Sequence, residues 1–151
     1  MTVTAPLVFP SEAWARHAAQ VLHQDPSSQA ALAAFGAFTA GAVLEKGDGL
    51  AADFCLYAEV APGKEPVLRL CDDEDELDDL APDYLGHAPH KLVRDLLRAV
   101  LAGETPDVLA LVTSGRVKLV KGDLGRVVKV AGQHKNAGLA AIRSIPTQTL
   151  G

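Results

Sequence analysis

The sequence is poor in aromatic residues and in cysteine, and it has no excess of positive charge. Only 5% of its 151 residues are aromatic, so the apolar side chains are mostly Ala, Leu and Val, which supply flexible aliphatic volume. Two cysteines are too few for a disulfide framework or a four-ligand zinc site. A formal net charge of -5 argues against nucleic acid as the main partner.

Long apolar runs and nucleotide-binding motifs are also missing. No window approaches about 18 uninterrupted apolar residues, and the first ten residues hold no basic region followed by an apolar run, so we expect a cytoplasmic protein. Neither Gly-x-x-x-x-Gly-Lys-Ser/Thr nor Gly-x-Gly-x-x-Gly occurs. With 48% hydrophobic residues, the chain is expected to fold as one domain over 1–151, with a loose N-terminal segment over 1–9.

Apolar periodicity predicts the order of the elements. A period near 3.6 residues indicates helices, and alternation of apolar and polar residues indicates strands. Helices are expected after Ser11, over 26–35, over 92–101, from Pro106 to Val112, over 124–131 and over 139–145. Strands are expected over 38–44, 52–58, 68–70, 84–87 and 117–119.

The first three strands are expected to pair as an antiparallel meander. A slip of one residue would turn a whole apolar set towards water, so the pattern constrains the register. Pairing Leu56 with Leu70 keeps the apolar side chains on one face and places Cys55 opposite Cys71 on the other. We expect both thiols to stay reduced.

The polar clusters contain no recognisable catalytic or metal-binding motif. The acidic run DDEDELDD, residues 72–79, lacks the turn glycine of a calcium loop, so we expect a solvated connection. The five histidines are dispersed, and His87 and His90 around Pro89 would supply only half of a metal site. We therefore predict no catalytic residues, no metal, no cofactor and no enzymatic activity.

A more specific pattern lies in residues 102–125, AGETPDVLALVTSGRVKLVKGDLG. It combines a Gly-Glu-x-x-Pro-like turn, a helix ending in Ser-Gly, and a strand of alternating basic and apolar residues that closes on Gly-Asp. Together with the order of elements from Ser11 to Pro146, it resembles the sterol carrier protein family of intracellular lipid-transfer domains, in a bacterial-type form. The chain departs from the pattern at Leu119 and Val120, two apolar residues where one is expected, which indicates a bulge or a shift of the strand end.

The resemblance implies an α/β fold of the α+β type, with a five-stranded, largely antiparallel sheet covered by helices and an apolar tunnel between the layers. Without it, the apolar stripes would be interpreted as a filled core. With it, we expect a lipid-binding cavity lined by Phe38, Leu44, Phe54, Leu56, Leu68, Leu70, Leu97, Val100, Leu101, Leu111, Val117, Leu119 and Val128.

The leading hypothesis is non-enzymatic lipid binding or transfer, with a fatty acid, a fatty acyl chain or a similar lipid as ligand. An apolar tunnel discriminates weakly, since one methylene is worth only about 1–3 kcal/mol, and the hypothesis does not specify a sterol. Arg116, Lys118 and Lys121 form a solvated basic face that we expect to contact anionic membranes weakly.

Two other hypotheses remain open at this point. The chain could be an interaction module, dimeric with a second copy, whose groove takes an amphipathic helix in place of a lipid. A small hydrolase or isomerase, using a carboxylate and a histidine, is the third.

Overall fold

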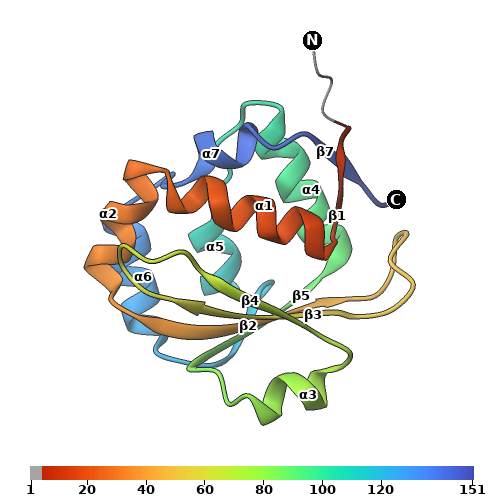
Figure 1. Cartoon of the computed structure of the whole chain (residues 1–151), viewed down its shortest axis with the longest axis horizontal. Coiled ribbons are helices and arrows are strands. Elements are labelled where there is room, and N and C mark those ends of the chain that lie inside the picture. The colour runs from red at the N-terminus through yellow and green to blue at the C-terminus, as the bar shows by residue number, and fades with distance from the viewer. Residues whose placement is uncertain (1–4) are drawn as a thin grey trace.

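A computed structural model describes residues 5–151 as a sheet with helices on both sides (Figure 1). The strands are β1 (Leu7–Phe9), β2 (Phe38–Glu45), β3 (Phe54–Val60), β4 (Val67–Cys71), β5 (Tyr84–Pro89), β6 (Lys118–Lys121) and β7 (Thr147–Thr149). The helices are α1 (Glu12–His23), α2 (Pro26–Phe35), α3 (Glu74–Asp79), α4 (His90–Leu101), α5 (Val108–Thr113), α6 (Leu124–Gln133) and α7 (Leu139–Arg143).

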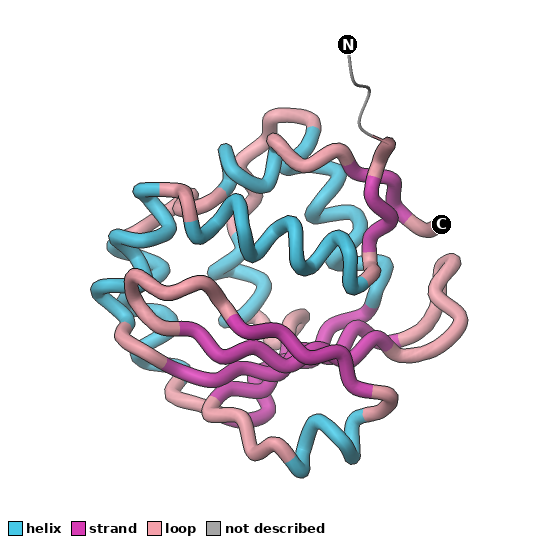
Figure 2. The backbone as a smooth tube through the Cα atoms, in the orientation of Figure 1, coloured by secondary structure: helices cyan, strands magenta, loops and turns pink. Residues whose placement is uncertain are grey.

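The main sheet has five strands in the order β4-β3-β2-β5-β6. The β2–β5 pairing is parallel and the other pairings are antiparallel, so the predicted five-stranded, largely antiparallel sheet is confirmed. Figure 2 shows α3 on one side of this sheet and the other helices on the opposite side. We call these two sides the α3 face and the helix-facing side.

The predicted register of the meander is also confirmed. Leu56 pairs with Leu70, and Cys55 pairs with Cys71. At the other edge, the β5–β6 register shifts between Leu85 and Gly86, which pair with Lys121 and Leu119. Val120 is therefore the extra residue of a bulge, at the position where the sequence departs from the family pattern.

The acidic run is a helix and not a loop, which corrects our expectation. Asp73 caps α3 by accepting a hydrogen bond from the Glu76 backbone N–H at 2.9 Å, and acidic residues fill the first turn, where the helix dipole favours negative charge. Leu77 is 0% exposed and packs into the core of the α3 face. The sequence pattern missed this helix because one apolar residue among acids shows no period.

Leu77 fits because the strand beneath it has no side chain at the point of contact. A Cβ atom added to Gly41 of β2 would lie 2.9 Å from Cδ1 of Leu77 and 3.0 Å from Cδ1 of Leu85. Such distances are shorter than van der Waals contact. A glycine at this position therefore allows α3 to lie close against the sheet.

The structure also differs from two sequence-based expectations, a loose N-terminal segment and a helix that begins at Pro106. Residues 7–9 are not loose, because β1 pairs in parallel with β7, with Leu7 opposite Thr147; residues 1–4 lie outside the described part of the chain. The helix expected to open at Pro106 begins at Val108, because Asp107 is the residue whose carboxylate accepts from the Ala110 N–H, at 3.0 Å.

Replacing the buried leucine tests how much of the stability this face supplies. Leu77→Ala is expected to lower the free energy of unfolding by about 2–5 kcal/mol, because it leaves a cavity that the sheet cannot close. Asp78→Ala, at an exposed position of α3 outside its first turn, is the matched control and should change it by less than about 0.5 kcal/mol. Urea denaturation followed by circular dichroism measures both, and equal effects would contradict the packing described.

Candidate functional site

The two faces of the sheet differ in how completely they are covered. On the α3 face, Val43 and Cys55 are each 1% exposed. On the helix-facing side, Ala42 of the central strand β2 is exposed, and its neighbours Leu44 and Leu56 are only half-buried, although helices lie over this side (Figure 1). Apolar side chains in a filled core lose nearly all their accessible surface. The helix-facing side is therefore less tightly packed than the α3 face.

Small residues form the centre of the helix-facing side. Ala42 pairs with Leu56 on one side and with Gly86 on the other, and Ala40 pairs with Ala58. A Cβ atom added to Gly86 would find no atom nearer than the Lys118 carbonyl oxygen at 3.8 Å, so there is room above the sheet here. The lining predicted from the sequence consisted of large apolar residues and did not include these small ones. The alternating alanines on one face of β2 could have indicated them.

The predicted lining residues on the sheet share this side. Strand pairing places on it Phe38, Leu44, Phe54, Leu56, Leu68, Leu70 and Leu119. Of those from the helices and the loop before β6, Leu97 and Val100 are buried and present almost no accessible surface. The remaining ones, Leu101, Leu111, Val117 and Val128, are half-buried.

Aromatic rings fill one end of the helix-facing side. The rings of Phe35 and Phe38 lie 4.8 Å apart, and Tyr84 lies 5.4 Å from Phe35 and 5.7 Å from Phe38. The guanidinium of Arg126 in α6 stacks over the Phe35 ring at 4.9 Å and donates to the Phe35 carbonyl. These contacts connect α2, the sheet and α6.

Two grooves open near the turn between β3 and β4. One, of about 330 Å³, is lined mainly by apolar residues of α1 and α2, including Leu22 and Leu32. The other, of about 520 Å³, includes Phe38 in its wall. Both grooves include Val60 and Lys64, so this turn separates two concave surfaces.

The two histidines considered as metal ligands, His87 and His90, each contact a different partner. Nε2 of His87 lies 2.6 Å from Oε1 of Glu74, whereas Nδ1 of His90 lies 3.0 Å from the Gly47 carbonyl oxygen. Within residues 5–151, no group of three or more His, Cys, Asp and Glu side chains is placed to hold a metal ion. The predicted basic residues Arg116, Lys118 and Lys121 are all exposed.

Both thiols are buried on the α3 face and unbonded. Burial, followed by the negative charge of Asp53, raises the pKa of Cys55 to about 11. Burial also raises the pKa of Cys71, with Glu76 adding to the effect. Thiolate is the nucleophilic form, so these cysteines are poor nucleophiles in the folded protein.

The fold of the chain is similar to that of two solved structures. Sterol carrier protein 2 matches with a TM-score of 0.65 and 18% identity, over 89% of this chain and 97% of that one. A conserved hypothetical protein from Thermus thermophilus, suggested to be a sterol carrier protein, matches with a TM-score of 0.67 and 16% identity, over 96% of this chain and 94% of that one. The chain has a sterol-carrier-protein-like fold.

That likeness concerns the fold alone, because the sequences differ at most positions. No protein-family model and no curated protein sequence matches the chain. In the part of the chain that the structure describes, none of the helices of this sterol-carrier-like fold has the length and apolar character needed to cross a bilayer.

The thiols provide a test of the α3 face. At pH 8 the folded protein is expected to react with dithionitrobenzoate far more slowly than a free thiol, because a pKa near 11 leaves thiolate on the order of 0.1% of the Cys55 population. In urea, both cysteines should react at the rate of an unstructured peptide, which is the control. Rapid modification of the folded protein would indicate an accessible thiol that the structure does not contain.

Proposed function

We propose that the chain binds a lipid with a fatty acyl chain, without covalent chemistry, between the helix-facing side of the sheet and the helices above it. The observation that supports this most is the exposure of Ala42 in the central strand, beneath a helical layer. An accessible apolar surface at the centre of a covered sheet offers space that an acyl chain could fill. The sterol-carrier-like fold supports lipid as the ligand class.

Affinity in such a site comes from removing methylene groups from water, at about 0.8 kcal/mol each. The small residues Ala40, Ala42 and Gly86 leave room over the sheet, and the half-buried Leu44 and Leu56 provide apolar contact beside them. These groups cannot donate or accept protons, so the proposed role is that of a carrier. We place this role in the cytoplasm, where reducing conditions keep thiols such as Cys55 and Cys71 unbonded.

Adjacent residues of β2 allow a matched test, because they point to opposite faces. Ala42→Phe would fill the proposed space, so the affinity for a dansyl-labelled fatty acid should fall at least about tenfold, or about 1.4 kcal/mol, with little change in the free energy of unfolding. Val43→Phe adds volume to the filled core at a residue that is 1% exposed. It should cost about 1–3 kcal/mol of stability and retain binding in the folded fraction.

Fluorescence titration and urea denaturation measure the two quantities. If Ala42→Phe destabilised the protein as much as Val43→Phe, the helix-facing side would be a filled core. Native mass spectrometry of freshly purified protein adds an independent measurement. A co-purified lipid supports the carrier, whereas a ligand-free dimer together with no fatty-acid binding by the parent chain would favour the interaction module.

A further inference from the structure

A stripe of small residues crosses the helix-facing side of the sheet diagonally. Ala40 of β2 pairs with Ala58 of β3, and Ala42, two residues further along β2, pairs with Gly86 of β5. Ala88 lies on the same side, two residues further along β5. We call these five residues the small-residue stripe. Their short side chains leave room above the sheet along this line.

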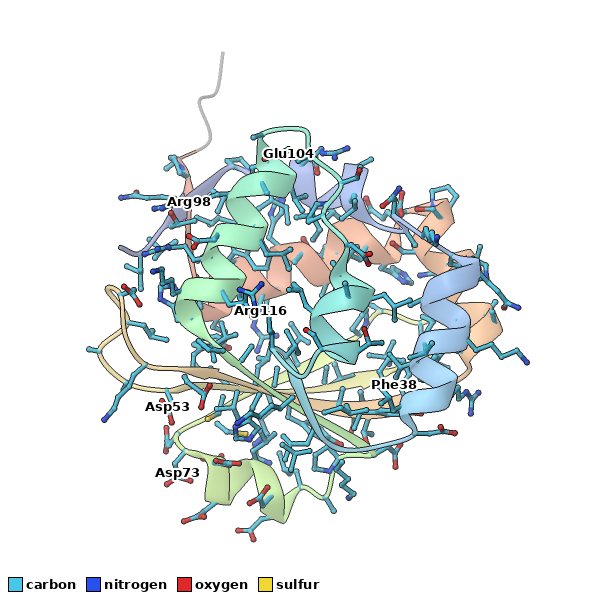
Figure 3. All side chains as sticks on the ribbon, turned by 180° about the vertical axis from the view of Figure 1, so that it is seen from behind. Phe38, Asp53, Asp73, Arg98, Glu104 and Arg116 are labelled. Carbon is cyan, nitrogen blue, oxygen red and sulfur yellow. The ribbon has the colours of Figure 1, made fainter. Side chains whose placement is uncertain are left out.

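The small-residue stripe is accessible in its middle and closed at one end. Ala42 is exposed, whereas Ala88 is 6% exposed. Figure 3 shows that α4 begins at the end of the sheet near the labelled Asp53, with Phe38 at the opposite end. His90 is the first residue of α4, so it lies at the closed end of the stripe.

The side chain of His90 is on the helix-facing side. Pro89 is extended, with φ -61° and ψ 138°, so the alternation of β5 continues and places His90 on the same side as Ala88. The His90 ring also stacks with the ring of Phe9, at 6.4 Å between centroids and 27° between planes. Phe9 belongs to β1, which lies on the side of the sheet that α1 covers (Figure 1). Both observations place the imidazole over the closed end of the stripe.

One ring nitrogen of His90 is buried without a hydrogen-bond partner. The residue is 1% exposed, and its Nδ1 lies 3.0 Å from the Gly47 carbonyl oxygen. A carbonyl only accepts, so Nδ1 carries the hydrogen and Nε2 of the neutral ring is an acceptor. Among residues 5–151 nothing donates to Nε2. Because Nε2 is on the side of the ring away from Gly47, it is directed from the β2–β3 hairpin back over the sheet.

A buried acceptor without a partner is destabilising, so an occupant that donates to it is favoured. Two other histidines with a buried ring nitrogen do not provide the same kind of site. Nε2 of His87 lies 2.6 Å from Oε1 of Glu74 on the α3 face, and His23 at the end of α1 is only half-buried. His90 therefore combines complete burial with a place at the end of the small-residue stripe.

We propose that His90 binds the head group of the lipid, and that this head group carries an O–H donor, as in a long-chain alcohol or an undissociated carboxylic acid. The inference rests on the proposed function, because it places the chain of the lipid along the small-residue stripe. Nε2 accepts the O–H hydrogen bond while Nδ1 stays bonded to Gly47. A carboxylate has no hydrogen to donate, and burial of its charge against a lone pair is unfavourable.

Two ligands that differ in one donor test this assignment. Hexadecanol has an O–H group, and hexadecyl methyl ether has a methyl group in place of that hydrogen. In competition with the dansyl-labelled fatty acid, hexadecanol should bind the parent chain about tenfold more tightly than the ether. Equal affinities would show that Nε2 has another partner, such as a buried water molecule, and would overturn the assignment of His90 alone. A chain that binds neither lipid nor the labelled fatty acid would overturn the proposed function itself.

The same competition with palmitic acid and methyl palmitate distinguishes the two sources of the O–H group. A preference for palmitic acid that depends on His90 would include undissociated acids among the ligands. A preference that depends on His90 and is confined to hexadecanol would restrict the site to alcohols.

Three variants separate recognition of the head group from a structural role. His90→Asn keeps an amide donor for Gly47 near the position of Nδ1 but has no atom at Nε2, so the preference for hexadecanol should disappear. His90→Gln places its amide near the position of Nε2 and should restore part of the preference. His87→Asn, on the α3 face, is the matched control and should keep all of it.

The measured quantity is the ratio of the two affinities within each variant, with urea denaturation to confirm that the variant folds. A purely structural role of His90 would weaken both ligands equally and leave this ratio unchanged in His90→Asn, which would overturn the proposal. The comparison in the parent chain decides the question without any variant if His90→Asn does not fold.

Discussion

Leu77 packs into the sheet beside Gly41, and this contact determines which face of the sheet is filled. The helix that carries it is short and acidic, and its apolar contact with the sheet is the burial of Leu77 at 0% exposure, beside the contacts of Glu74 with His87 and of Glu76 with Arg69. Because the core of the α3 face includes Val43, Cys55 and Leu85, the sheet does not need complete burial on its other side. The accessible alanines of the helix-facing side are compatible with a stable fold for this reason.

The division of the sheet into a filled face and an accessible face follows from strand alternation. Neighbouring residues of β2 point to opposite sides, so Val43 is buried while Ala42 is exposed. Stability and ligand binding can therefore change independently at adjacent positions of one strand. The proposed carrier role is compatible with this arrangement, because widening the space for a ligand would not remove contacts from the opposite core.

Local patterns predicted the sheet well, because strand register depends on alternation that can be read along the chain. Leu56 opposite Leu70 follows from such alternation. The irregularity at Val120 was indicated instead by the departure from the family pattern, which left open whether it was a bulge or a shift of the strand end. Helix α3 was missed because its stability comes from a tertiary contact of Leu77, and β1 because its partner β7 lies near the far end of the chain. The small residues around Ala42 were missed as lining residues because small side chains give only a weak hydrophobic signal, and the burial of Leu97 and Val100 depends on packing among helices.

The parallel pairing of β1 with β7 has a consequence for the order of folding. Leu7 meets Thr147, so this small sheet closes a loop that contains almost the entire chain. Closing so long a loop costs conformational entropy that local contacts do not cost. Backbone hydrogen bonds, the hydrogen bonds of Trp14 with Thr147 and of Arg98 with Thr149, and the burial of Phe9 offset this cost. The two ends should therefore join after the main sheet has formed.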